Sequence, residues 1–461
     1  MATLPIDNPA TGDRIAELPA DDSDSIAHKA TAARAAQPAW AAVPLVERRA
    51  VISRFRESLV TERDALARTL SQEMGKPVAQ ARNEINGLLG RIDFFLDKAE
   101  ASIADETVFS EGGMVERITH EPLGVVANIS AWNYPYFVGC NVIVPALLTG
   151  NAVLYKPSEH ATLTGLNIVR LLHAAGVPAA VLAPVVGAGG AGHALLEQRI
   201  DGLFFTGSHA TGVRIAQALA PRLVKLQLEL GGKDPTWVRA DADPKVAAES
   251  LADGAMYNTG QSCCSVERIY VHESLHDEFV AHFLATVAGM KMGDPLLEDT
   301  YIGAIARAPQ IGVLEHQVAD ALAQGGALRA GGGRVAGPFG GRGHWFAPTV
   351  ITGAHHGMAL MREESFGPVI GIQKVADDDA AVALMNDTRF GLTAGIFSRD
   401  EARARALLAR VNAGSVYWNC CDRGSPRLPW AGHGDSGIGL TLSTHGIQTF
   451  TRPRAWHLRQ P

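Results

Sequence analysis

The chain has 461 residues, of which 47% are hydrophobic and 19% are charged, and its formal net charge is -7. This length exceeds what one compact core usually contains, so we expect two or three domains. The acidic balance argues against a surface for nucleic acid or anionic membranes, and the lack of any run of about 18 uncharged apolar residues argues against a membrane-spanning helix.

Apolar residues at helical spacing dominate the start of the chain. Residues 24–41 and 46–71 show this spacing with few Gly or Pro, which predicts two or three helices. From about Gly124, β-rich runs alternate with helical stretches, which predicts βαβ units and a parallel, doubly wound sheet. The expected strands are 125–130, 152–156, 181–186 and 203–206, and the expected helices are 162–175, 191–198 and 211–220. Ligands of such sheets bind beyond the carboxyl ends of the strands, where LYKPSE and FFTGS lie.

The stretch VVGAGGAG at 185–192 has the spacing of a dinucleotide fingerprint, because Gly187, Gly189 and Gly192 fit G-x-G-x-x-G. Two observations weaken this match. A chain with 48 glycines produces such spacings by chance, and the next expected strand ends without the acidic residue that would hold the ribose. The motif alone is therefore weak evidence for a pyrophosphate site.

A second alternating region follows Leu230 and predicts a second α/β unit. Its expected strands are 235–238, 267–272, 368–375, 395–398 and 415–419, and its expected helices are 247–256, 275–288, 310–324, 377–386 and 402–411. The glycine-rich stretch 325–345 predicts a solvent-exposed loop or hairpin.

Cysteine usage and the N-terminal residues favour a cytoplasmic location. The N-terminal segment lacks the basic region and apolar core of a signal peptide. An odd number of cysteines with two adjacent pairs is a poor disulfide framework. The five cysteines are Cys140, Cys263, Cys264, Cys420 and Cys421. His272 and His276 have H-x3-H spacing, but no C-x2-C pair precedes them, so we expect no metal site.

Three parts of the sequence offer catalytic side chains. A cysteine follows a Gly-Gln pair on an expected loop, where Cys263 or Cys264 would be a nucleophile or a buried small side chain. Glu229 lies in an apolar strand and would be a structural partner or a base with a raised pKa. Asn133 follows the expected strand 125–130 and would stabilise an oxyanion or a turn. The residues alone leave these alternatives open.

The motifs, taken in order, make the chain resemble the NAD(P)-dependent aldehyde dehydrogenase superfamily over essentially its full length. They are EMGKP (73–77), WNYP (132–135), KPSE (156–159), FTGS (205–208), LELGGK (228–233), GQSC (260–263), EESFGPV (363–369) and SGIG (436–439). The resemblance implies an α/β fold with a Rossmann-type cofactor domain (1–101 and 124–230), an α/β catalytic domain (231–443) and a small β oligomerisation flap (102–123 and 444–461).

The resemblance also implies the catalytic roles. Cys263 would be the nucleophile, Glu229 the base, and Asn133 the oxyanion donor together with the backbone N–H of the cysteine. The thiolate would add to the aldehyde to give a thiohemiacetal, hydride would pass to the nicotinamide, and a water activated by Glu229 would hydrolyse the thioester. The expected reaction is the NAD-dependent oxidation of an aldehyde to a carboxylate.

The cofactor site implied by the resemblance does not depend on the G-x-G-x-x-G spacing. Its phosphates are expected at the helix after FTGS, and its adenine near VVGAGGAG. A carboxylate at Glu159 binds two ribose hydroxyls and repels a 2′-phosphate, which favours NAD, with NADP as the alternative. The expected cofactor residues are Trp132, Lys156, Ser158, Glu159, Gly189, Gly207, Ser208, Gly212, Leu230, Glu364 and Phe366.

The substrate is less well defined, although residues 417–430 correspond to the family's substrate-access loop. Arg423 and Arg427 in this loop would hold the far carboxylate of a semialdehyde such as succinate semialdehyde, or would be solvated or contact another subunit. Asp422 would instead suit a cationic aldehyde such as betaine aldehyde. An aromatic tunnel, which would suit an aromatic aldehyde, is expected from Tyr134, Phe137, Trp418 and Trp430.

Three other functions remain open at this point. A CoA-acylating relative would pass the thioester to CoA, and the presence of Glu229 favours water instead. A cysteine hydrolase would need a histidine base, and His272 is the nearest in sequence. A non-catalytic protein on the same fold would show no turnover. The resemblance further implies a homodimer or homotetramer assembled through the flap.

Overall fold

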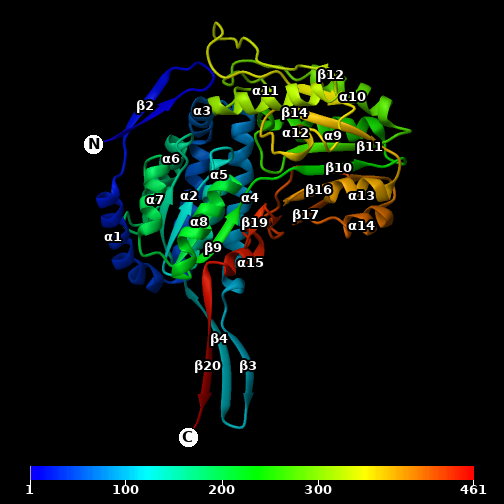
Figure 1. Cartoon of the computed structure of the whole chain (residues 1–461). Coiled ribbons are helices and arrows are strands. Elements are labelled where there is room, and N and C mark those ends of the chain that lie inside the picture. Colours follow the sequence, from blue (N-terminus) through cyan, green and yellow to red (C-terminus); the bar gives the residue numbers. More distant parts are fainter. Residues whose placement is uncertain (1, 461) are drawn as a thin grey trace.

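In the computed structural model, residues 2–460 fold around two largely parallel β-sheets, and a narrow three-stranded sheet projects from one end of the molecule (Figure 1). The order of the first sheet is β19 (Gly437–Ile438), β9 (Lys225–Glu229), β8 (Gly202–Thr206), β5 (Val125–Ile129), β6 (Ala152–Lys156) and β7 (Leu182–Pro184). Its strands run parallel except β19, which pairs antiparallel with β9. The doubly wound sheet expected from the sequence is therefore confirmed.

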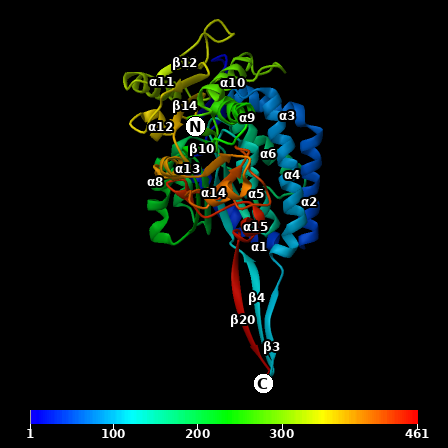
Figure 2. The same cartoon turned by 90° about the vertical axis from the view of Figure 1, so that its right-hand side faces the viewer.

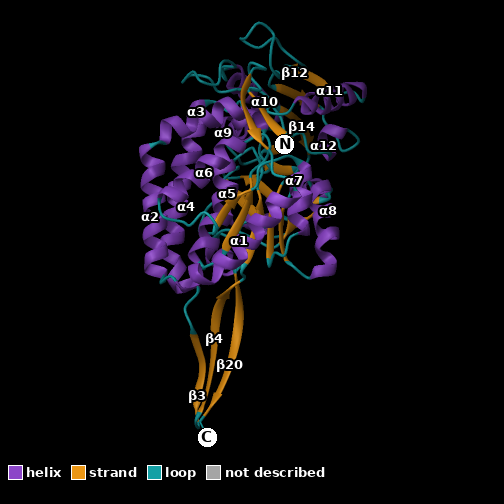
Figure 3. Ribbon diagram, turned by 90° about the vertical axis from the view of Figure 1, so that its left-hand side faces the viewer, coloured by secondary structure: helices purple, strands orange, loops and turns teal. Residues whose placement is uncertain are grey.

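Helices cover both faces of the first sheet (Figure 3). One face carries α1 (Ser23–Ala42), α7 (Gly189–Glu197) and α8 (His209–Leu219). The other carries α5 (Pro135–Leu148) and α6 (Thr162–Ala174), backed by α2 (Leu45–Thr61), α3 (Arg63–Met74) and α4 (Val78–Ser102). The helices predicted in the first 71 residues correspond to α1, α2 and α3.

Two helices next to the site, α4 and α5, were not predicted from the sequence. Nearly every residue of α5 is buried, so its sequence lacks the one-sided apolar stripe that marks a surface helix. The stripe of α4 is interrupted because polar side chains such as Gln80, Glu84 and Arg91 are also buried on it. These buried polar residues contact the loops and the helix start around the site.

The second sheet confirms the second α/β unit. Its order is β12 (Ala327–Ala330), β13 (Thr349–Thr352), β14 (Val369–Val375), β11 (Val266–His272), β10 (Asp234–Val238), β16 (Thr393–Phe397) and β17 (Ser415–Trp418), and only β12 is antiparallel to its neighbour. The helices around it are α9 (Pro244–Met256), α10 (His276–Ala288), α11 (Ala308–Ala323), α12 (Ala359–Arg362), α13 (Asp378–Asn386) and α14 (Glu401–Leu408). The expected loop 325–345 is irregular after β12, which pairs with β13 outside that segment.

The projecting sheet consists of β3 (Glu106–Glu111), β4 (Met114–Pro122) and β20 (Thr451–Arg459), and it stands clear of the two larger sheets and their helices (Figure 2). Its residues fall in the two segments that the sequence analysis assigned to a flap. It leaves apolar side chains such as Phe109 and Trp456 exposed, so it has surface to offer a partner. The division into domains stays a prediction, and β19, although it lies within 231–443, joins the first sheet.

Short elements complete the chain. They are β1 (Thr3–Asp7), β2 (Arg14–Pro19), η1 (Ala220–Arg222), η2 (Tyr257–Gly260), β15 (Phe390–Gly391), β18 (His433–Gly434) and α15 (Ser443–Gln448). Within residues 2–460, none of the helices combines the length and the apolar character needed to cross a membrane.

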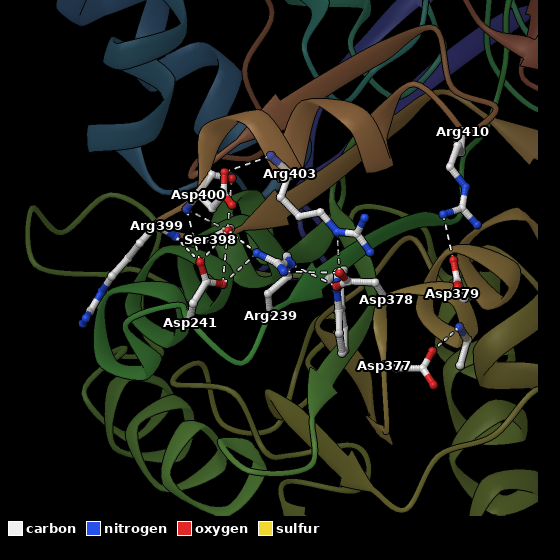
Figure 4. Close-up of polar contacts among 12 residues, drawn as sticks. Arg239, Asp241, Asp377, Asp378, Asp379, Ser398, Arg399, Asp400, Arg403 and Arg410 are labelled. Carbon is white, nitrogen blue, oxygen red and sulfur yellow. Dashed lines mark hydrogen bonds and ion pairs between the residues drawn. The ribbon is translucent and has the colours of Figure 1, made fainter.

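A network of ion pairs ties the carboxyl ends of β10 and β16 in the second sheet to α13 and α14 (Figure 4). Asp378, at the start of α13, accepts hydrogen bonds from the Nε atoms of Arg239 and Arg403, both at 2.9 Å. Arg239 also donates to Asp241 at 3.0 Å and to the Ser398 hydroxyl at 2.8 Å. This network therefore joins the loops after β10 and β16 to both helices.

Candidate active site

The site lies where the chain order of the first sheet reverses. β5 and β8 are neighbours, but the chain leaves them toward opposite edges of the sheet, which creates a crevice at their carboxyl ends. The loops that follow them carry Asn133 and Ser208, while Cys263 and Phe366 come from the segments just before β11 and β14. Residues of the first sheet, of the segments before β11 and β14 and of the start of α11 line a cavity of about 860 Å³. This volume is within the range of small-molecule sites, about 300–1,000 Å³.

Of the two adjacent cysteines, Cys263 lines this cavity. It follows the tight turn η2, in which Asn258, Thr259 and Gly260 have left-handed φ angles of 54°, 57° and 68°. A Cβ on Gly260 would lie 2.3 Å from the carbonyl oxygen of Gly367, so this position requires glycine. The turn places the Cys263 side chain at the wall of the cavity.

Cys264 has different surroundings and does not line that cavity. Its Sγ donates to Oδ1 of Asp422 at 2.9 Å. The neighbouring Cys263 side chain, burial and the Asp422 carboxyl together raise the pKa of the Cys264 thiol well above its usual range. Burial raises the pKa of Asp422 itself to about 7. A thiol that stays protonated is a poor nucleophile, so the structure favours Cys263 over Cys264.

Glu229, the last residue of β9, lines the same cavity and is otherwise buried. Its Oε1 accepts hydrogen bonds from Nε2 of Gln227 at 3.0 Å and from the Thr441 hydroxyl. Burial raises the pKa of Glu229 to about 7, although the Thr441 hydrogen bond and the Arg91 guanidinium act in the opposite direction. A carboxyl group that titrates near neutral pH is suited to general-base chemistry.

Asn133 lies in the loop between β5 and α5, is buried and lines the cavity. Its Nδ2 donates to the backbone oxygen of Gln261 at 3.2 Å, which places the amide beside the residues that precede Cys263. Because an amide nitrogen carries two hydrogens, one remains for an oxyanion that forms at Cys263.

Ten of the eleven expected cofactor residues line the cavity, and the exception is Gly212. Lys156 and Glu159, at the carboxyl end of β6, form a pair with 3.7 Å between Nζ and the carboxylate. Ser208 is the N-cap residue of α8 but does not cap that helix with its side chain, so the helix N-terminus is free to bind an anion. An anion-binding helix end and a polar pair in one long cavity fit a dinucleotide. A Cβ on Gly212 would lie 2.6 Å from Leu230, so this glycine lets α8 pack on the cavity wall.

The end of the cavity near Cys263 carries Glu364 and Phe366. Oε1 of Glu364 accepts from the backbone N–H of Gly232 at 3.1 Å. Burial, and next the Glu267 carboxylate, raise the pKa of Glu364 to about 8. The Phe366 ring lies edge-on to the Trp132 ring, with 5.4 Å between centroids. The family resemblance of the sequence predicts that the nicotinamide end of the cofactor lies against these side chains.

The glycines of VVGAGGAG lie at the other end of the cavity. Gly187 has a φ of 148°, and a Cβ there would meet Ala191 at 2.7 Å, so this glycine serves the turn into α7. Gly189 and Gly192 line the cavity, and a Cβ on Gly189 would meet no other atom within 4 Å. The stretch therefore borders open space.

Sequence reasoning missed part of the cavity wall, including the part that the start of α11 supplies. Arg307 and Gln310 reach it from the start of α11, and Nε2 of Gln310 donates to the Ser365 oxygen at 2.6 Å. His160 also lines it and packs against Trp132 with 6.3 Å between ring centroids. None of these residues attracted notice in the sequence, because α11 shows only the pattern of an amphipathic helix and His160 merely follows KPSE.

A stack of side chains begins at Tyr134, next to Asn133. The Tyr134 and Phe137 rings are nearly parallel, with 5.8 Å between centroids. The guanidinium of Arg91, from α4, lies 3.8 Å from the Phe137 ring centroid. It donates to Oδ1 of Asn141 at 3.0 Å and approaches the oxygen of Gly424, in the substrate-access loop, at 3.5 Å.

Arg91 is only 8% exposed, and within residues 2–460 no carboxylate lies in ion-pair distance of it. Burial lowers its pKa to about 10, which leaves it charged at neutral pH. No sequence pattern predicts a role for this residue, because one arginine in a helix with many charges carries no signal. Arg91 is thus a buried cation without a carboxylate partner, which contacts the access loop but is not among the residues that line the cavity.

The other expected substrate residues do not form one cluster. Trp430 is buried and forms a backbone bridge with Thr441, a partner of Glu229. Arg423 and Arg427 are exposed on the access loop. The expectation that Trp418 joins an aromatic tunnel is wrong, because it is 37% exposed on the edge strand β17 and its indole donates to the oxygen of Ser398 at 2.9 Å.

Comparison with known proteins supplies independent findings. The family model described as "Aldehyde dehydrogenase family" matches residues 2–456. A 3,6-anhydro-alpha-L-galactose dehydrogenase of Streptomyces coelicolor is 36% identical over 459 residues, which cover 99% of this chain and 93% of that protein. A Mycolicibacterium smegmatis protein, provisionally named a succinate-semialdehyde dehydrogenase for NADP(+), is 34% identical over 452 residues, with coverage of 97% and 87%. The crystal structure of an NAD-dependent aldehyde dehydrogenase from Sinorhizobium meliloti matches with a TM-score of 0.96 and 32% identity, covering 100% of this chain and 92% of that one.

Proposed function

The chain belongs to the aldehyde dehydrogenase family, as its motifs indicated, and from this premise we propose that it oxidises an aldehyde to a carboxylate through a covalent intermediate on Cys263. One observation carries the proposal. Cys263, Glu229 and Asn133, which lie far apart in the sequence, line one cavity together with the residues expected to hold the cofactor.

Cys263 supplies the nucleophile of the proposed reaction. Its thiolate attacks the carbonyl carbon, so a C–S bond forms while the carbonyl π electrons move to oxygen. Nδ2 of Asn133 and the backbone N–H of Cys263 donate to this oxyanion, and loss of one such donor typically lowers the rate about 10²–10³-fold. Bound NAD(P) supplies the chemistry of a hydride acceptor, and the carbon is left attached to Cys263 as a thioester.

Glu229 then serves as the base for hydrolysis. It accepts a proton from a water molecule whose oxygen attacks the thioester carbon, and the C–S bond breaks to release the carboxylic acid and the Cys263 thiolate. The position of Glu229 on the cavity wall, with neutral hydrogen-bond partners, supports water rather than CoA as the acceptor of the acyl group. A CoA-acylating enzyme is the alternative.

The proposed cofactor is NAD, with NADP as the alternative. Lys156, Ser158 and Glu159 would hold the adenosine ribose, and a carboxylate at Glu159 disfavours a 2′-phosphate. The positive charges of Lys156 and of Arg307, across the cavity, both act on Glu159 and would partly offset that repulsion. The relatives include both types by name, one NAD-dependent and one for NADP(+).

The proposed substrate is a small aldehyde with an anionic or oxygen-rich far end, such as a semialdehyde. Arg91 is a better anchor for that end than Arg423 or Arg427, because it is buried and contacts the access loop, whereas the other two are exposed. A guanidinium has five N–H groups, so its contacts with Asn141 and Gly424 leave donors for a substrate. Betaine aldehyde and aromatic aldehydes remain alternatives.

The test follows the absorbance of reduced nicotinamide with purified protein. The aldehydes are succinate semialdehyde, its neutral analogue butanal, betaine aldehyde and benzaldehyde, each with NAD or NADP, with and without CoA. We expect turnover with NAD and without CoA, and none in Cys263→Ala. Turnover that requires CoA would overturn the role of Glu229.

A matched variant tests the anchor in the same assay. Arg91→Met keeps an apolar contact with Phe137 and removes the charge. Because a hydrogen bond to a charged group contributes about 1.5–3 kcal/mol, we expect KM for succinate semialdehyde to rise roughly 10- to 100-fold while KM for butanal changes little. Equal changes for both aldehydes would show that Arg91 is structural.

The proposed assembly is a homodimer or homotetramer formed through the projecting sheet. The exposed faces of β3 and β20 support this proposal, because an extended sheet with free edges is a surface that usually pairs with another chain. Light scattering on the purified protein, with a variant that lacks residues 444–461, tests it. The proposed location is the cytoplasm.

A further inference from the structure

The lysine of the EMGKP motif has no role in the reaction described above, yet its side chain is fully buried beside the site. Lys76 follows Gly75, which ends α3 with a φ of 79°, and forms an ion pair with Glu84 of α4. Neither side chain is among those that line the cavity. A buried ion pair seldom adds net stability, because the loss of hydration of two charges offsets their attraction. The position of this pair therefore needs another explanation.

Lys76 holds the loop between β5 and α5 at Asn133 itself. Its Nζ donates to the backbone oxygen of Asn133 at 2.7 Å and lies 3.9 Å from the centroid of the Tyr134 ring. The same backbone oxygen accepts a second hydrogen bond from Nδ2 of Asn258 at 3.2 Å. Two side-chain donors from separate elements therefore fix the peptide group of Asn133.

Glu84 holds the end of the same loop. Its Oε1 accepts hydrogen bonds from the backbone N–H groups of Tyr136 at 2.8 Å and Phe137 at 3.4 Å, in the first turn of α5. The N-cap residue of α5, Tyr134, offers no capping side chain of its own. Glu84 supplies the missing acceptor from α4 and places a negative charge at a helix N-terminus, where it is stabilising.

We propose that Lys76 and Glu84 act as a positioning pair for Asn133, so that the EMGKP motif fixes the oxyanion donor relative to Cys263. The proposal rests on the function proposed above for Asn133. With the backbone held at Asn133 and at the first turn of α5, the Asn133 amide points to the Gln261 oxygen, two residues before Cys263. A displacement of about 1 Å in such a group is enough to slow catalysis roughly 10²-fold.

The test compares Lys76→Met, Asn133→Ala and the variant that carries both changes. The measured quantity is the rate of the first turnover, seen as the burst of reduced cofactor, with the Kd for NAD from protein fluorescence as a second readout. We expect Lys76→Met to slow the burst roughly 10²-fold and Asn133→Ala roughly 10²- to 10³-fold, with Kd for NAD unchanged in both. In the Asn133→Ala background, Lys76→Met should slow the burst less than about threefold, because the lysine is proposed to act only through the Asn133 amide, which this background lacks.

A neutral variant guards against misfolding. Lys76→Met combined with Glu84→Gln leaves no unpaired buried charge and keeps an acceptor for α5. We expect it to fold, by circular dichroism, and to lose as much burst rate as Lys76→Met. Full activity in this variant, or losses that multiply in the cycle, would overturn the positioning role. A normal burst in Asn133→Ala alone would overturn the oxyanion role first, and the positioning role with it.

Discussion

The oxyanion loop (residues 130–137) and the cofactor loop (residues 363–367) approach Cys263 from different sheets, and each is held by one buried lysine–glutamate pair. In the oxyanion loop the lysine binds a backbone carbonyl and the glutamate caps a helix. In the cofactor loop the glutamate likewise accepts from two backbone N–H groups, but the lysine donates to a side-chain hydroxyl and not to a backbone carbonyl. Glu267 accepts hydrogen bonds from two successive backbone N–H groups at 2.8 and 3.0 Å, and Lys233 donates to the Ser365 hydroxyl at 3.0 Å.

The two pairs therefore fix different things. Phe366 has a left-handed φ of 48°, a conformation that costs a bulky residue about 1–3 kcal/mol, and its N–H bond to Glu267 helps to hold it there. Asn133 does not have a left-handed backbone, and its pair aims a side chain instead. We infer that loss of the pair at the cofactor loop lowers stability first, whereas loss of the pair at the oxyanion loop lowers the rate first.

The largest expected effect on stability is that of Glu267→Ala. This change leaves the Lys233 charge buried without a partner and removes the acceptor for two backbone N–H groups. Removal of one member of a buried pair typically costs about 3–5 kcal/mol. We expect a loss of this size in the free energy of unfolding, measured by urea denaturation with fluorescence detection.

The matched control is Lys233→Met combined with Glu267→Gln. It removes both charges and keeps a side-chain oxygen near the loop, so we expect it to recover most of the loss. A decrease below about 1 kcal/mol for Glu267→Ala would show that strain at Phe366 is not held by this pair.

Glu229 is a third buried carboxyl group at the site, and it differs from Glu84 and Glu267 because it has no lysine partner. Its hydrogen-bond donors, Gln227 and Thr441, are neutral. A permanent ion pair would keep the carboxyl ionised, while a base must accept a proton and return it in each cycle. The two paired glutamates are thus suited to hold structure, and the unpaired one is suited to chemistry.

This contrast predicts the pH dependence of thioester hydrolysis. Because the pKa of Glu229 is raised to about 7, its active deprotonated fraction grows as pH rises, about tenfold per unit below pH 7, and levels off above about pH 8. The measurement is the steady rate after the burst with p-nitrophenyl acetate. Thr441→Val removes a hydrogen bond that lowers this pKa, so its midpoint should move above 7, and Glu229→Gln should lose the dependence. A wild-type rate that is flat below pH 7 would contradict the assignment.

Much of the fold was predictable because the two α/β units repeat strong local signals. The predicted strands and helices from 125 to 411 are all present, with small shifts at their ends. The elements that the sequence did not predict lack an apolar stripe on one side. An example is α5, which is buried on all sides. Short pairings such as β19 with β9 depend on contacts distant in sequence, which no local pattern reveals.

The residues of the candidate site also fall into a group that the sequence predicted and a group that it did not. Motifs identified many of the residues that line the cavity, because some positions there require a particular residue: a Cβ on Gly207 would lie 2.5 Å from the Phe205 ring. The substrate side and the supports of the site depend on single side chains at ordinary helix positions. Arg91, Glu84 and Arg307 are examples, and only the packing of α4 and α11 against the loops shows where they point.

The ion-pair network at the carboxyl ends of β10 and β16 should give the smallest effect, and it sharpens the contrast with the buried pairs (Figure 4). Partial burial alone would raise the pKa of Asp378, but hydrogen bonds from Arg239, Trp237 and Arg403 bring it down to about 2. The folded-state pKa is thus below that of the unfolded chain, so the stabilisation is fully present above about pH 4 and is lost as pH falls toward 2. Asp378→Asn should cost about 1 kcal/mol at pH 7, because Arg403 is half exposed, and should leave the burst rate unchanged.

Salt separates the two kinds of ion pair in the same urea experiment. In about 1 M NaCl the Debye length is about 3 Å, so the loss from Asp378→Asn should shrink while the loss from Glu267→Ala should persist, since water and ions do not reach the Lys233 side chain. If both losses fell equally with salt, burial would not be what distinguishes the pairs at the site from those at the surface. If Asp378→Asn also slowed the burst, the network after β10 and β16 would be coupled to Cys263. An ion pair could then affect catalysis without contacting the loops that carry Asn133 and Phe366, which would contradict the distinction drawn between the pairs.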